Sequence, residues 1–301
     1  MKIVCIMIGV KIAYLLLVHK SPEQVNLFIQ QLLNYGDSDV YVHVDKKNKE
    51  LIDKLVKSPR VFVLSKYNVR WGSFEIVKAA IDLMRLACES GQKYTHIYLG
   101  SGQDLLIKKG LYNYLERNIK NTFIHIGSEI TNRDRESARY RICWPKFLMI
   151  RNDLHIYRFI RIVMQILCSL DIVLRNNKRR LNRPVRFYEG HTWFIAPFEV
   201  NNYIVNYVKD NPDYYEYWED SLASDLMFFQ TIIMNSPYAI DVKEELMYVE
   251  FGHSFTTMNH PLSINSQIFS KIKDDNYFCA RKFEWEEDEG FIKEIVKNTL
   301  V

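Results

Sequence analysis

The sequence predicts an α/β fold with a mostly parallel sheet and helices on both of its faces. Two observations indicate this fold. Short apolar runs of strand length alternate with longer segments in which apolar residues recur at helical spacing, and cap and turn residues mark the ends of these segments. Repeated strand–helix–strand units of this kind build a parallel sheet, because each helix carries the chain back across one face.

The first half of the chain contains most of these units. Residues 12–18 form a continuous apolar run. Ser21 and Pro22 then provide the N-cap and first turn of a helix, Gln24 is its capping-box partner, and Gly36 ends it. The other elements expected in this half are a helix between Ser73 and Gly91 and strands at 40–45, 60–64, 94–99 and 122–126.

The second half is expected to be less regular. Its expected elements are helices at 159–174, 201–208 and 225–234, strands at 189–195, 243–251 and 276–283, and a final helix after an acidic stretch. In parallel sheets, ligands bind at the carboxyl ends of the strands. Here those ends carry His19, Asp45 and the segment 100–104.

A basic segment interrupts the pattern at residues 146–186. It contains ten Lys or Arg and two Asp, a local charge of +8, so the rest of the +4 chain sums to −4. An apolar-faced basic helix is typical of proteins that bind an anionic membrane surface. The alternative interpretation is a helical insertion with a solvated basic rim. We predict a single domain over residues 1–301 with this segment as a basic helical insertion.

Composition places the chain among soluble globular proteins. Its 301 residues are 48% hydrophobic and 25% charged, which excludes disordered, collagenous and coiled-coil classes, and no nucleic-acid partner is expected. Lys11 interrupts the apolar run at the N-terminus, which argues against a signal peptide or a spanning helix, although residues 1–10 stay ambiguous.

The chain has five cysteines, an odd number, and they are widely spaced: Cys5, Cys88, Cys143, Cys168 and Cys279. This pattern predicts buried thiols in a reducing cytoplasm rather than disulfides.

Seven short motifs occur in a recognisable order along residues 11–283. They are Ile12–Lys20, Tyr41–Asp45, Val69–Phe74, Gly102–Lys108, Gly190–Phe194, Phe228–Thr231 and Ala280–Phe283. Together these motifs resemble the core-2/I-branching β-1,6-N-acetylglucosaminyltransferases (glycosyltransferase family 14), which also include peptide O-xylosyltransferases. The resemblance implies a GT-A-like, Rossmann-like fold and an inverting transfer from a UDP-sugar to an acceptor hydroxyl.

The resemblance also implies that no metal and no cofactor assists the donor. The family lacks the Asp-x-Asp motif of other GT-A enzymes and uses basic side chains, which here fall on Arg281 and Lys282. Two fixed cations can neutralise a departing diphosphate as a divalent metal would. Without the resemblance, a salt bridge to the acidic residues from Glu284 onwards is the simpler interpretation. The alternative to a metal-independent enzyme is a metal-dependent transferase of another GT-A family.

Five residues are predicted to bind the nucleotide. His19 and Asp45 follow strands, where a carboxylate can accept hydrogen bonds from ribose hydroxyls or a uracil N–H. A helix cap for Asp45 and simple exposure for His19 are equally compatible with the sequence. Trp71 could pack near the donor or in the core, and Gly102 and Asp104 follow the fourth expected strand.

The general base is the main departure from the family pattern. The resemblance implies a Glu in a Pro-Asp-Glu run before the aromatic helix, and this Glu falls on Leu226. Asp225, which matches the Asp of that run, is the nearest carboxylate and is predicted to be the catalytic base. A helix N-terminal charge is its alternative role. Glu219, Asp220 and Glu189 are the other carboxylates considered.

Acceptor contacts are predicted at Trp193, His191 and Tyr140. An indole face suits stacking on a sugar ring, although core packing is an equal alternative for Trp193. We therefore expect a glycosyltransferase using UDP-GlcNAc or, next, UDP-xylose, in surface-polysaccharide synthesis. The rival is a UDP-sugar-binding relative without catalysis. We expect the enzyme in the cytoplasm or peripheral at the inner face of the membrane, with a glycan or lipid-linked glycan as acceptor.

Overall fold

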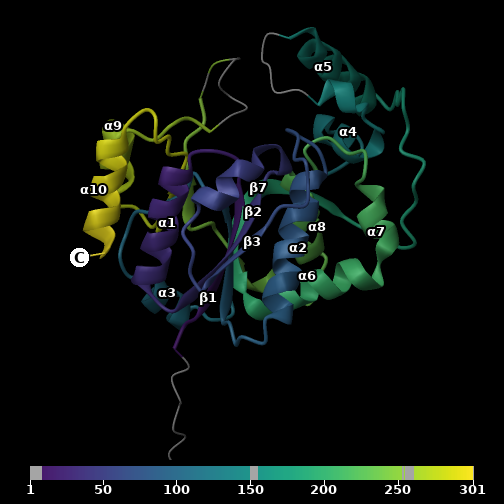
Figure 1. The fold of residues 1–301 in the computed structure, drawn as a ribbon. Coiled ribbons are helices and arrows are strands. Elements are labelled where there is room, and N and C mark those ends of the chain that lie inside the picture. The colour runs from purple at the N-terminus through teal and green to yellow at the C-terminus, as the bar shows by residue number, and fades with distance from the viewer. Residues whose placement is uncertain (1–8, 150–154, 253, 255–260, 301) are drawn as a thin grey trace, which may run out of the picture.

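A computed structural model describes residues 9–149, 155–252, 254 and 261–300. Its centre is a seven-stranded sheet in the order β3-β2-β1-β4-β7-β6-β8, in which only β7 runs antiparallel to its neighbours (Figure 1). The mostly parallel sheet expected from the sequence is confirmed. The strands are β1 (Ile12–Val18), β2 (Ser38–Val44), β3 (Val61–Leu64), β4 (His96–Ser101), β6 (Thr122–Ile130), β7 (Phe187–Pro197) and β8 (Val242–Lys243).

Helices cover both faces of this sheet, each against its own apolar core (Figure 1). On one face lie α1 (Pro22–Tyr35), α3 (Leu111–Arg117) and α10 (Glu289–Leu300), and on the other lie α2 (Glu75–Glu89), α6 (Phe198–Asp210) and α8 (Phe228–Met234). Alternate residues of β1 supply the two cores: Tyr14 and Leu16 face α1, whereas Ala13 and Leu15 face α2. Burial on both faces explains why β1 is an uninterrupted apolar run.

A second, three-stranded sheet lies at the carboxyl end of β4. Its order is β5-β10-β9, and β10 runs antiparallel to β5 and parallel to β9. Because β5 follows β4 after a short turn, this sheet holds β10 next to the carboxyl ends of the parallel strands of the large sheet. Its strands are β5 (Leu105–Leu106), β9 (Met247–Val249) and β10 (Cys279–Arg281).

The other helices of the described chain are α5 (Ile156–Ser169), which has 14 residues, and eight shorter ones. The shorter ones are η1 (Lys46–Lys54), η2 (Arg135–Ser137), α4 (Ala138–Arg141), η3 (Lys146–Leu148), α7 (Pro212–Tyr217), η4 (Ser224–Leu226), η5 (Pro237–Asp241) and α9 (Ser266–Ile272).

Two elements differ from the sequence prediction because tertiary contacts divide them. The helix expected at 225–234 is the turn η4 and then α8, separated at Met227, whose φ of −136° is not helical. The strand expected at 243–251 is divided between β8 of the large sheet and β9 of the small one. The residues between β8 and β9 carry the chain from one sheet to the other.

The insertion at 146–186 contains one long helix, α5, whose own arginines are buried. Arg158 and Arg161 are 5% and 7% exposed, and Arg161 lies over the ring of Trp71, 5.1 Å from its centre. Exposed cations of the insertion lie outside α5, among them Lys146, Arg175, Lys178 and Arg180. The helix ends at Ser169 rather than 174, because Asp171 adopts a left-handed φ of 65°.

The cysteines agree only partly with the prediction that all are buried. Cys168 and Cys279 are buried, whereas Cys88 and Cys143 are half-buried, and all four are free thiols. Cys5 and most of the ambiguous segment 1–10 lie outside the described residues. Within the described ranges, none of the helices has the length and apolar character needed to cross a bilayer.

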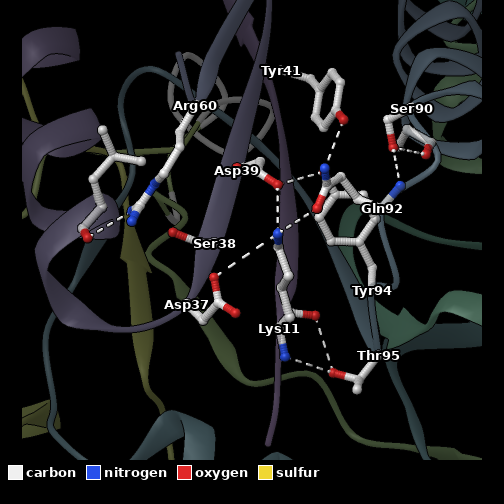
Figure 2. A network of polar contacts seen from close by, with 12 residues as sticks. Lys11, Asp37, Ser38, Asp39, Tyr41, Arg60, Ser90, Gln92, Tyr94 and Thr95 are labelled. Carbon is white, nitrogen blue, oxygen red and sulfur yellow. Dashed lines mark hydrogen bonds and ion pairs between the residues drawn. The ribbon is translucent and has the colours of Figure 1, made fainter. Parts of the chain in front are cut away.

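A polar network joins strands at the amino-end edge of the large sheet (Figure 2). The Nζ of Lys11 lies 3.1 Å from the Oδ2 of Asp39 and donates to Gln92. The hydroxyl of Tyr94 donates to the same Asp39 oxygen, at 2.7 Å, and contacts the hydroxyl of Tyr41. The network thus joins the amino ends of β1, β2 and β4.

We expect Asp39→Asn to lower the free energy of unfolding by about 2 kcal/mol, because Lys11 then loses its closest carboxylate in a half-buried environment. Asp37→Asn is the matched control: its side chain is 66% exposed and lies 4.0 Å from the same Lys11 Nζ. That substitution should change the unfolding free energy by no more than about 0.5 kcal/mol. Urea unfolding measures both, and equal losses would contradict the assignment.

Candidate functional site

The candidate site lies at the carboxyl ends of β1, β2 and β4. His19 follows β1 and Asp45 follows β2, while the backbone N–H groups of Asp45 and Gly102 donate to the carbonyls of Val18 and Leu17. These bonds hold the three strand ends together. The expectation that His19, Asp45 and the segment 100–104 share one edge is therefore confirmed.

Arg281 is the most constrained side chain of the site. Its Nη2 donates to the Oγ of Ser101 at 3.2 Å, its Nε lies 3.5 Å from the Oδ1 of Asp104, and its Cζ lies 4.3 Å from the ring centre of Trp193. The residue is 7% exposed. Contacts on three sides fix the guanidinium between the small sheet, which carries it, and the large sheet, which carries its partners.

Asp104 supports Arg281 from inside the protein. The carboxylate has no exposed surface, and it accepts hydrogen bonds from the N–H and hydroxyl of Ser101 and from the hydroxyl of Tyr98. Burial raises the pKa of Asp104, and the charge of Arg281 opposes this shift. The prediction that Asp104 contacts the nucleotide is corrected: its position is inside, beneath Arg281.

Gly102 is likewise placed for packing. A Cβ at this position would lie 2.7 Å from Val25 of α1. Glycine therefore allows the first helix to approach the end of β4.

Two lysines share one carboxylate beside Arg281. Lys20 and Lys282 both form short ion pairs with Glu284, whose side chain is 8% exposed. Burial acts to raise the pKa of Glu284, but the hydrogen bonds and charges of Lys20 and Lys282 outweigh it and lower this pKa. The salt bridge considered for Lys282 in the sequence is therefore formed, and the shared Glu284 holds the two ammonium groups close to each other.

His19 and Asp45 lie next to these cations. Desolvation is the largest cause that lowers the pKa of the His19 imidazole, and the charges of Lys20 and Lys282 act in the same direction. Asp45 accepts a hydrogen bond from the backbone N–H of Lys47 at 3.0 Å and so caps η1. The cap considered as its alternative role is thus present.

Trp71 borders the other side of the site. The residue is 38% exposed, and its ring lies under Arg161 of α5. Gly72, at φ 70°, accepts a hydrogen bond from the backbone N–H of Ala223, so this turn packs directly on the loop that carries Asp225. A Cβ on Gly72 would meet Leu222 at 3.0 Å, so glycine permits this contact.

Asp225 is half-buried and accepts a hydrogen bond from the hydroxyl of Thr192 at 2.8 Å. Desolvation raises the pKa of its carboxyl, whereas the Thr192 hydrogen bond and the charges of Arg139 and Arg281 act in the opposite direction. A partly accessible carboxylate with a raised pKa is chemically suited to accept a proton. Leu226, at the family Glu position, packs against an apolar cluster instead.

The three other carboxylates considered as the base differ in whether they form an ion pair. Glu219 pairs with Lys78 at 2.7 Å, and Asp220 pairs with Arg179 at 2.9 Å. Glu189 has a pKa raised by burial and opposed by the charge of Arg139. Glu189 is thus the reserve carboxylate that most resembles Asp225.

The predicted acceptor residues separate into two groups. Tyr140 is 4% exposed, and its ring stacks on Phe187 at 3.9 Å, so we assign it to the core rather than to an acceptor contact. Trp193 is partly exposed and stacks on Arg281. His191 is also partly exposed, and its Nδ1 lies 2.8 Å from the Oε1 of Glu245.

Four residues of this site were not assigned a role from the sequence. Lys20 shares Glu284 with Lys282, Ser101 accepts a hydrogen bond from Arg281, and His125 and Glu245 join His191 in a second cluster. Lys20 lies inside the first family motif, so the sequence could have indicated its role. Nothing in the sequence indicated a role for Glu245, which is 54 residues from His191 along the chain. Only the arrangement of the two sheets brings these two residues together.

Comparison with models of protein families gives a match over most of the chain. A model of the Core-2/I-Branching enzyme family matches residues 12–273. The match therefore includes the strand ends, Asp225 and the His125 cluster, and it stops before Arg281 and Lys282. No curated protein matches the chain.

We expect Glu284→Gln to lower the free energy of unfolding at pH 7 by about 1–2 kcal/mol, because Lys20 and Lys282 lose their shared charge partner. The folded-state pKa of Glu284 is lowered, so its contribution is complete above its unfolded pKa of about 4.3 and is lost as the pH falls through the folded value. The difference between variant and wild type should therefore shrink below about pH 4.

Urea unfolding between pH 7 and pH 3 measures this difference. Glu287→Gln removes the same charge from an exposed residue nearby and serves as the control. A Glu284→Gln effect that persists unchanged at pH 3 would contradict the ion-pair assignment.

Proposed function

The chain belongs to the core-2/I-branching enzyme family, a family of glycosyltransferases, and we propose that it transfers N-acetylglucosamine from UDP-GlcNAc to a hydroxyl of a glycan acceptor. We further propose that the transfer inverts the anomeric centre and needs no metal at the diphosphate. The observation that carries this proposal is the group of cations at the strand ends: Lys20, Arg281 and Lys282.

Arg281 and Lys282 are proposed to bind the diphosphate of the donor. Arg281 is already held by Ser101, Asp104 and Trp193, so little conformational entropy is lost when it meets a phosphate. Lys282 exchanges part of its contact with Glu284 for a phosphate oxygen. Fixed positive charge at this place stabilises the charge that develops on UDP as it leaves.

Asp225 is proposed to be the general base. The acceptor oxygen forms a bond to the anomeric carbon while the bond from that carbon to the β-phosphate oxygen breaks. The proton of the acceptor hydroxyl passes to Asp225, and the bonding electron pair leaves with UDP. The raised pKa of Asp225 favours this role, and Thr192 orients the carboxylate.

The nucleoside and the acceptor are proposed to lie on opposite sides of these groups. His19, Asp45 and the exposed part of Trp71 border the donor side, whereas Trp193 and His191 border the acceptor side. UDP-xylose is the alternative donor. Leu226 at the family Glu position favours one further candidate, a UDP-sugar-binding relative without turnover.

We also propose that the enzyme works in the cytoplasm at an anionic membrane surface, where a lipid-linked glycan would be its acceptor. Apolar residues of α5 and the following loop are exposed, among them Ile156 at 61%, Val163 at 54% and Leu170 at 66%. Exposed cations lie in the same insertion at Lys146, Arg175, Lys178 and Arg180. An apolar face with basic neighbours matches the chemistry of an anionic bilayer.

We expect UDP release to persist in EDTA and to identify the donor when a panel of UDP-sugars is tested with a glycan acceptor. Lys282→Ala should lower kcat by about 10²–10³-fold through lost charge stabilisation. Asp225→Asn should lower kcat by about 10²–10⁴-fold through loss of the base. Because the pKa of Asp225 is raised, wild-type activity should rise with pH through a value above that of an ordinary aspartate.

The control for Lys282→Ala is Lys273→Ala, which removes an exposed lysine. The control for Asp225→Asn is Glu189→Gln, which changes a similar half-buried carboxylate. Loss of activity with Glu189→Gln but not Asp225→Asn would move the base to Glu189. Complete loss in EDTA would favour the metal-dependent reading. UDP binding without turnover for any donor would favour the non-catalytic relative.

We expect the protein to float with vesicles that contain phosphatidylglycerol and not with pure phosphatidylcholine vesicles. The double substitution Ile156→Ser and Val163→Ser should abolish flotation, because it removes apolar side chains that would enter the bilayer. Ile240→Ser is the control, since Ile240 is 83% exposed but lies on η5, outside the insertion. Flotation that is independent of anionic lipid would refute the membrane proposal.

A further inference from the structure

Two histidines and a glutamate form a compact cluster next to the donor site. The Nδ1 of His191 lies 2.8 and 3.0 Å from the two carboxylate oxygens of Glu245, and the Nδ1 of His125 lies 3.8 Å from Oε1 of the same carboxylate. The two imidazole rings stack with centres 4.3 Å apart. The proposed transfer reaction uses neither His125 nor Glu245.

An irregularity of the sheet produces this cluster. Strands β6 and β7 pair regularly at Ile124 and Phe194, but the next pair along is Ile126 with Gly190. The three residues 191–193 therefore face His125 alone. Such a bulge redirects side chains, and bulges are over-represented next to active sites.

Gly190 lets the two strands approach at this point. A Cβ on Gly190 would lie 1.9 Å from the carbonyl oxygen of His125. Any other residue would force the strands apart, and His125 and His191 would no longer stack.

The donor set matches a transition-metal site. One ligand atom from each of His125, His191 and Glu245 can be chosen so that all three lie within 4.8 Å of one another. In a tetrahedral zinc site with bonds of about 2.0–2.1 Å, ligand atoms lie about 3.3 Å apart. The two Nδ1–Oε1 separations of 2.8 and 3.8 Å bracket this value.

The hydrogen bonds of the cluster explain only part of its geometry. The hydrogen bond to Glu245 is sufficient to explain the position of His191. This hydrogen bond does not explain why the His125 ring stacks on the His191 ring with its Nδ1 toward the same carboxylate.

We propose that His125, His191 and Glu245 bind one divalent transition-metal ion of the zinc class. Two His and one Glu leave one tetrahedral position for water or another ligand. Glu245 lies between β8 of the large sheet and β9 of the small one, so the ion joins the two sheets. His191 and Trp193 are two residues apart on β7, so the ion lies beside the ring on which Arg281 stacks. This proposal does not depend on the proposed transferase activity.

The test is Zn²⁺ binding to the full chain after treatment with EDTA and its removal. Isothermal titration should give about one Zn²⁺ per chain, and His125→Ala, His191→Ala and Glu245→Gln should each weaken binding by at least about 10-fold. Co²⁺ bound in place of Zn²⁺ should give visible absorption bands that the same three variants lose. Zn²⁺ should also raise the melting temperature of the wild type but not of the three variants.

Glu244→Gln is the matched control, because it removes the same charge from the adjacent, exposed residue and should leave Zn²⁺ affinity unchanged. His125, with a side chain 44% exposed, tolerates truncation, so its variant keeps the test valid if Glu245→Gln fails to fold. The absence of Zn²⁺ binding, or equal affinity in wild type and the three variants, would overturn the proposal. Neither result would depend on UDP-sugar turnover, which EDTA assays measure separately.

Discussion

The buried contact of Arg281 with Asp104 is the interaction on which the candidate site depends. A carboxylate without exposed surface is tolerated only when charges and hydrogen-bond donors surround it, and Arg281, Ser101 and Tyr98 provide them. Arg281 belongs to the small sheet, whereas its partners belong to the end of β4 and to β7. This one contact therefore fixes the small sheet against the large one and determines where the next residue, Lys282, lies.

Strand β7 connects the two halves of the proposed chemistry. Successive side chains of a strand point to opposite faces, so Thr192 meets Asp225 on one side while Trp193 meets Arg281 on the other. The proposed base and the proposed diphosphate cation are thus positioned by neighbouring residues of one strand. The bulge opposite His125 comprises the same three residues, 191–193.

Local signals predicted the elements whose ends depend on nearby residues. The run 12–18 and the helix that starts at Pro22 and ends before Gly36 were predicted almost to the residue. The capping box expected of Ser21 and Gln24 is not formed, because the Ser21 hydroxyl donates to Glu286 and the Gln24 side chain bonds to the backbone of Phe283 and Trp285. The stretches 225–234 and 243–251 were not predicted correctly, because contacts with other elements divide them. The burial of the two arginines of α5 was not predicted either. Arg158 and Arg161 are buried, and Arg161 packs on Trp71, which lies far from it in the sequence.

The sequence by itself determined the order of strands and helices, the family motifs and the carboxyl-end edge at which His19 and Asp45 meet. Only the tertiary structure decided that Asp104 and Tyr140 are interior, that Lys20 and Lys282 share Glu284, and that Glu245 joins two histidines. The physical reason is that strand identity follows from local hydrophobic periodicity. Side-chain partnership between residues 54 or 180 positions apart, as for His191 with Glu245 and Ser101 with Arg281, follows from sheet register and burial.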